Sequence, residues 1–67
     1  MAIARVTTLT ASHPKGWQPA VEAALERASQ TLRNITGIEV LSQKAKVENG
    51  RITEYRATIN ITFILDE

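Results

Sequence analysis

The chain has 67 residues and a formal net charge of +1, with 8 lysines and arginines against 7 acidic residues. This length admits a single domain over residues 1–67, and the small charge gives no electrostatic reason to expect a nucleic-acid or membrane partner. The absence of cysteine excludes disulfides and cysteine-ligated zinc. No apolar run could cross a bilayer and MAIARVTTLT lacks the layout of a signal peptide, so we expect a soluble cytoplasmic protein.

The size of the chain also limits its hydrophobic core. Trp17, Tyr55 and Phe63 are the only aromatic residues. Ordering a chain costs about 1.5 kcal/mol per residue, so chains this small gain little net stability from their own core. With no disulfide and no evident metal site, association with further copies is the remaining source of stability, and we expect a homo-oligomer.

A strand and a helix are predicted in the first half of the chain. Residues 3–10 read as a strand and TASHPK at 10–15 as a loop. A helix is predicted over residues 16–34, because its apolar residues recur with the i, i+3, i+4, i+7 spacing of one helix face. Pro19 falls in the first turn, where its missing N–H has no partner to lose. Gly37, just beyond, fits a left-handed C-terminal cap.

Two further strands are predicted in the second half. Residues 38–47 form the first, and its apolar positions change phase, which indicates a bulge near residues 41–42. ENG at 48–50 supplies a hairpin turn. The following TEYRATINITF alternates apolar and polar residues, so one face is apolar and the other is rich in threonine. The expected element order is β-α-β-β.

Element lengths bear on assembly. A helix of about 18 residues is roughly 27 Å long. A last strand over residues 52–65 would span roughly 45 Å. One helix cannot cover such a sheet, so the sheet should curl around it and leave a face or an edge for another copy of the chain.

With these elements in place, the sequence resembles the dodecin family over nearly its whole length. The resemblance rests on TAS at 10–12, AVEAALERASQTLRN at 20–34, IEV at 38–40, NGRITEY at 49–55 and the ending FILDE. It implies an α+β fold in which a three-stranded antiparallel sheet wraps around one helix. It also implies that twelve copies form a hollow sphere that binds and stores a small ligand.

The resemblance further implies a flavin pocket between subunits, for FMN or riboflavin. A tryptophan that stacks on the flavin ring is here Gly37, and a glutamine that hydrogen-bonds its polar edge is here Arg56. Lys44 matches a basic residue that in some members contacts phosphate-bearing ligands. Glycine offers no ring, and arginine can only donate hydrogen bonds. We therefore expect weak or absent flavin binding, and Gly37 is either a helix cap, the mark of an emptied pocket, or both.

A flavin-free shell with a structural or ion-binding role is the alternative, since the family includes a flavin-free branch with a calcium-binding member. No metal ligands can be assigned from the sequence, although carboxylates could converge across subunits: Glu48, Glu54, Asp66 and Glu67.

The remaining candidates read as structural. His13 is interpreted as a solvated loop residue, Trp17 as an apolar anchor, and Glu22 and Glu26 as part of the polar helix face. Ser12 has no histidine-and-acid context that would make it a nucleophile. No catalytic set emerges, and we expect a binding protein and not an enzyme.

Overall fold

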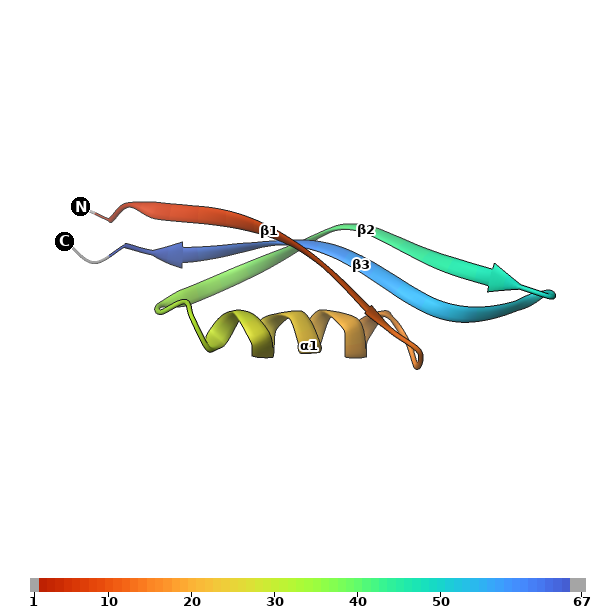
Figure 1. Ribbon diagram of the computed structural model, residues 1–67. Helices are drawn as coiled ribbons and strands as arrows, with labels where there is room; N and C mark the ends of the chain where they lie inside the picture. Colours follow the sequence, from red (N-terminus) through yellow and green to blue (C-terminus); the bar gives the residue numbers. More distant parts are fainter. Residues whose placement is uncertain (1, 66–67) are drawn as a thin grey trace.

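The computed structural model describes residues 2–65 and contains one helix and three strands within that range. The strands form an antiparallel sheet in the order β1-β3-β2, with the helix against one face (Figure 1). In chain order the elements are β1 (Ala4–His13), α1 (Trp17–Ser29), β2 (Ile35–Glu48) and β3 (Arg51–Ile64). The predicted α+β fold of β-α-β-β order is therefore confirmed.

The core is a contact between alanines of α1 and aliphatic residues of β3. Ala24 and Ala28 of α1 pack with Ile59 and Ile61, which are fully buried. Small side chains on the helix let its backbone approach the sheet closely. The alternation predicted for β3 is confirmed, because the buried residues of this strand occupy every second position: Ala57, Ile59 and Ile61.

The helix covers only part of the sheet. It packs mainly against β1 and β3, while Ile38 and Val40 of β2, on the same sheet face, remain 41% and 45% exposed. The described part of the chain is 52 Å long, and a helix of 13 residues spans only about 20 Å. The β2–β3 hairpin extends past the start of α1 (Figure 1). The helix is therefore shorter than the sheet, as the predicted element lengths indicated.

The helix ends earlier than predicted, at Ser29 and not near residue 34. The Ser29 hydroxyl donates to the Leu25 carbonyl at 2.8 Å, and the next two amides bond three residues back, which tightens the last turn. The left-handed step is made by Asn34, with φ of 60°. Within residues 2–65, no helix is long and apolar enough to span a membrane.

The prediction that Gly37 caps the helix is therefore wrong. Gly37 lies inside β2, and its φ is outside the left-handed region. The helix stops early, and β2 begins at Ile35, three residues before the predicted start of this strand. Asparagine tolerates left-handed geometry, so the chain needs no glycine for this turn.

The two irregularities predicted for the hairpin are confirmed. The register of β2 on β3 shifts between Val40 and Ser42, where the apolar phase changes in the sequence. Asn49 and Gly50 have φ of 52° and 74°, which is the geometry of a tight hairpin turn. Strand β1 is longer than predicted and continues to His13, since pairing with β3 extends as far as Tyr55.

The two conformational roles of glycine can be separated by substitution. Gly50→Ala should lower the free energy of unfolding by about 1 kcal/mol, because a side chain is strained at positive φ. Gly37→Ala is the matched control and should cause no loss, since an added Cβ meets no atom within 4 Å. Urea unfolding followed by circular dichroism, at one protein concentration, measures both. A loss of about 1 kcal/mol for Gly37→Ala would restore the cap interpretation.

Candidate ligand site

The three predicted pocket positions, Gly37, Lys44 and Arg56, lie on the face of the sheet that points away from α1. Residues of β3 alternate between faces, and the neighbouring Ala57 is buried toward the helix, so Arg56 points the opposite way. Lys44 is the register partner of Arg56, and Gly37 is that of Thr62. We call this surface the open face.

The positions do not form one cluster within a single chain. Lys44 and Arg56 are direct cross-strand partners, which places their Cβ atoms about 5 Å apart. The partner of Gly37, Thr62, lies further along β3, and the six residues from Arg56 correspond to about 20 Å of extended strand. A pocket that used all three positions would have to combine residues of different copies.

The space beside the Gly37 backbone is open. It is exposed, and a Cβ built on it would meet no heavy atom within 4 Å. Neither backbone geometry nor packing inside the chain therefore requires a glycine here. A Cβ would fit, and the glycine itself offers no ring on which a ligand could stack.

Arg56 is held by an acidic neighbour on its own strand. Its Nε and Nη2 atoms donate to the same carboxylate oxygen of Glu54, at 3.0 and 2.8 Å. The hydrogen bond from Arg56, followed by one from the Ser12 hydroxyl, holds the pKa of the Glu54 carboxyl below its usual value. The sequence analysis missed this pair, although the spacing of two residues on a strand, which puts both on one face, could have indicated it.

Lys44 is fixed through its backbone and exposed at its side chain. The indole Nε1–H of Trp17 donates to the Lys44 carbonyl at 3.0 Å. The Trp17 ring meets Tyr55 edge-on, with 4.8 Å between ring centroids. Trp17 is thus the anchor that the sequence predicted, at the helix start. Among residues 2–65, the Lys44 side chain makes no ion pair.

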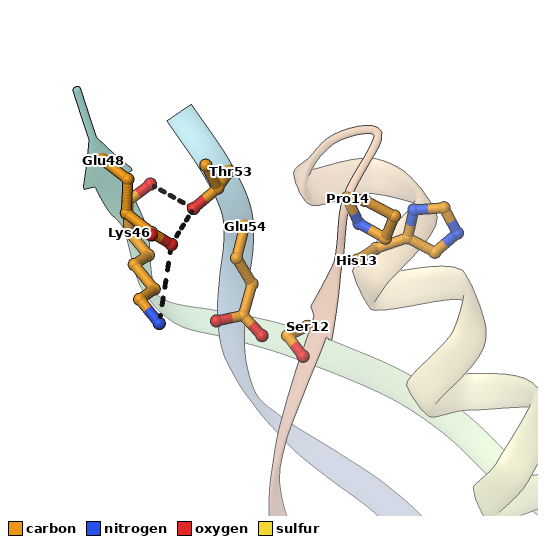
Figure 2. A pocket seen from close by; sticks show the side chains of 7 residues that line it. All are labelled: Ser12, His13, Pro14, Lys46, Glu48, Thr53 and Glu54. Carbon is orange, nitrogen blue, oxygen red and sulfur yellow. Dashed lines mark hydrogen bonds and ion pairs between the residues drawn. The ribbon is translucent and has the colours of Figure 1, made fainter. Parts of the chain in front are cut away.

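An open depression of about 300 Å³ adjoins this site near the hairpin (Figure 2). Thr53 Oγ1 lies 3.3 Å from Glu48 Oε1 and 3.4 Å from the Lys46 carbonyl, and Lys46 Nζ lies 3.8 Å from the same Glu48 oxygen. Figure 2 shows the Glu54 carboxylate directed toward Ser12. The lining residues are Ser12, His13, Pro14, Lys46, Glu48, Thr53 and Glu54.

These carboxylates do not form a metal site in the described chain. Within residues 2–65, no group of three or more His, Cys, Asp or Glu could hold a metal ion. Glu48 and Glu54 instead contact Lys46, Thr53 and Arg56. Asp66 and Glu67, the other carboxylates considered from the sequence, lie outside the described residues.

The residues present do not fit a flavin. A stacking ring is missing at Gly37, where the space is open. The Arg56 guanidinium carries only donors and is already bonded to Glu54, so it cannot accept a hydrogen bond from the polar edge of a flavin.

The fold and this open face define a small β-α-β-β protein with a polar sheet surface, and comparisons place it in a family. The profile of the family described as Dodecin matches residues 3–66. The dodecin of Thermus thermophilus is 30% identical over 59 residues, which are 88% of this chain and 86% of the relative. The chain therefore belongs to the dodecin family, as the sequence resemblance indicated.

Solved structures agree with this assignment. The structure of dodecin from Streptomyces coelicolor matches with a TM-score of 0.93 and 33% identity, covering 98% of this chain and 94% of that one. A calcium dodecin from Mycobacterium tuberculosis, described as a calcium-chelating immunodominant antigen with a novel calcium-binding site, matches with a TM-score of 0.82 and 25% identity. That match covers 96% of this chain and 91% of that one.

The Arg56–Glu54 pair leads to a prediction about the pKa of the Glu54 carboxyl. Because the pKa of Glu54 is lowered in the folded state, the pair stabilises the fold above the pKa of an unfolded glutamate. This contribution is lost as the pH falls through the lowered folded-state pKa. Arg56→Gln should raise the Glu54 pKa toward its usual value, as followed by the carboxyl carbon shift in NMR. Lys46→Ala should raise it less, since the Lys46 charge contributes less than Arg56. An equal rise of the Glu54 pKa in both variants would contradict the conclusion that Arg56 is the main cause of the lowered pKa.

Proposed function

We propose that this protein is a homo-oligomeric, dodecameric shell that binds and stores a small ligand other than flavin. The observation that carries the proposal is the open space at Gly37, in the position where the family resemblance expects a flavin-stacking ring. The fold supports assembly of the dodecin type, while the substitution removes the aromatic contact on which flavin affinity depends.

Exposed apolar residues support assembly. Val47 and Ile52, partners near the hairpin turn, are 61% and 45% exposed, and the helix does not reach them. An isolated two-stranded hairpin is marginally stable in water. Ile38 and Val40 add a second uncovered apolar strip. Contact with further copies would bury these residues and could bring Gly37 of one chain near Arg56 of another.

The described residues also support binding without turnover. Ser12 and His13 are adjacent on a strand, so their side chains point to opposite faces of the sheet. The His13 Nδ1 atom accepts the backbone N–H of Lys15 at 3.0 Å. The Ser12 hydroxyl lies beside the Glu54 carboxylate and helps to lower the pKa of that carboxyl (Figure 2). A serine and a histidine arranged in this way do not form a nucleophile–base pair.

An ion-binding shell is the second candidate, and the likeness to the calcium dodecin favours it. Glu48 and Glu54 line one depression of the single chain. A calcium ion needs six or more oxygen ligands, so further carboxylates from other copies would be required. Saturable calcium binding that raises the melting temperature of the oligomer would favour this function over storage of an organic ligand.

The flavin pocket can be tested by rebuilding it. The wild-type oligomer should not quench riboflavin fluorescence, whereas Gly37→Trp combined with Arg56→Gln should bind riboflavin at least about 100-fold more tightly, close to 2.7 kcal/mol. Arg56→Gln alone is the control and should stay weak, because it adds no ring. Light scattering establishes the oligomer for each variant.

Two outcomes would contradict the proposal. Strong saturable quenching by the wild type would mean that another aromatic residue replaces the missing stack. No gain in the double variant, as an intact dodecamer, would mean that Gly37 and Arg56 do not meet at one interface.

A further inference from the structure

The tip of the β2–β3 hairpin consists of Asn49 and Gly50. Both residues are exposed, and the tip lies at the end of the sheet that α1 does not reach (Figure 1). Glu48 and Arg51 are direct register partners, so these two residues alone join the strands. An asparagine side chain and the backbone nitrogen that follows it are therefore placed together in a solvated turn.

The groups that could react with each other at the tip are unoccupied. Among residues 2–65, the Asn49 carboxamide makes no hydrogen bond to another group. Gly50 lies between the strands, and the backbone hydrogen bonds that join residues 2–65 outside helices and strands do not use its N–H. Because glycine has no Cβ, no side chain shields this nitrogen from the Asn49 carboxamide. An electrophilic carbon and a nitrogen nucleophile are thus adjacent and accessible.

The other two asparagines of the chain differ in both respects. Asn60 Oδ1 accepts the Thr8 hydroxyl at 2.6 Å, and Asn34 Nδ2 donates to the Ile64 carbonyl at 3.5 Å. Each of these asparagines is followed by an isoleucine, whose branched Cβ crowds the backbone nitrogen. The chain therefore supplies two internal controls for the chemistry of Asn49.

The closed turn has to open before the two groups can meet. Attack on the carboxamide needs rotation about the Cα–C bond of Asn49, whereas the left-handed φ angles of 52° and 74° belong to the closed turn. Val47 and Ile52 beside the tip are 61% and 45% exposed, so few apolar contacts within the chain oppose this opening. The reactive geometry is reached by local opening of the hairpin end, without unfolding of the core.

We propose that Asn49 is a site of spontaneous deamidation in which the Gly50 backbone nitrogen is the nucleophile. This nitrogen loses its proton to water and bonds to Asn49 Cγ. The Cγ–Nδ2 bond breaks, and Nδ2 takes up a proton and leaves as ammonia. Water then opens the resulting cyclic succinimide at one of its two carbonyl carbons. Cleavage of the new bond gives aspartate, and cleavage of the original peptide bond gives isoaspartate, with no oxidant or cofactor involved.

Both products change the hairpin. Each adds a carboxylate, which cancels the formal net charge of +1 and places a second negative charge next to Glu48. Isoaspartate also adds a methylene group to the main chain, so a two-residue turn no longer holds Glu48 opposite Arg51. The reaction therefore alters, with time, the end of the sheet that carries the exposed Val47 and Ile52 side chains.

The site is tested by incubating the wild-type oligomer at neutral and at alkaline pH, followed by tryptic peptide mapping with mass spectrometry. Trypsin cleaves after lysine and arginine, which puts each asparagine in its own peptide and Asn49 in residues 47–51. Asn49 should convert at least about tenfold faster than Asn34 or Asn60, a barrier lower by about 1.4 kcal/mol. The rate should rise with pH, because the Gly50 nitrogen must lose its proton. Both aspartate and isoaspartate should be found at Asn49.

Gly50→Ala is the matched variant for the nucleophile. Its methyl group shields the nitrogen and should slow the conversion of Asn49 about tenfold, although it also weakens the turn. Equal rates at the three asparagines of the wild type, or a rate at Asn49 that Gly50→Ala leaves unchanged, would overturn the site. Aspartate without isoaspartate would mean that water attacks the carboxamide directly, which would overturn the role of the Gly50 nitrogen.

Discussion

The packing of α1 alanines against Ile59 and Ile61 of β3 is the contact on which the rest of the structure depends. It fixes which face of the sheet is covered, and strand alternation then sends Arg56 to the other face. Cross-strand register places Lys44 beside Arg56 in turn. The open face is therefore a consequence of the core, because every residue on it is the alternate of a residue turned toward the helix.

The same contact explains why the chain is suited to assembly. A helix of 13 residues cannot cover strands of 14 residues, since a strand rises more than twice as far per residue. Several of the uncovered apolar residues lie on β2 and on the hairpin, away from the part of the sheet that α1 covers.

The chain belongs to the dodecin family, but at two positions its residues differ from those that the family resemblance implies. Gly37 has no side chain at a place where the structure has room for a Cβ. Arg56 carries a positive charge that is hydrogen-bonded to Glu54. If these are the flavin-contacting positions that the family resemblance implies, the first change removes an apolar contact surface, and the second replaces a neutral hydrogen-bonding side chain with a cationic one.

The sequence alone determined the element types, the turn and the family, because each depends on short-range patterns. The alternation in β3, the phase change near residues 41–42 and the ENG turn are local signals of backbone geometry. The end of α1 was predicted wrongly, because apolar spacing continues through Leu32 and Ile35 while Leu32 reaches the core from a loop and Ile35 from β2.

Only the tertiary structure decided the composition of the site. The Lys44–Arg56 pairing depends on the register after a bulge, and one residue of slip would have moved Lys44 to the other face. The Trp17 bond to the Lys44 carbonyl joins residues 27 positions apart. Such contacts are set by how the helix and the hairpin meet in space, and no local pattern of residues specifies that arrangement.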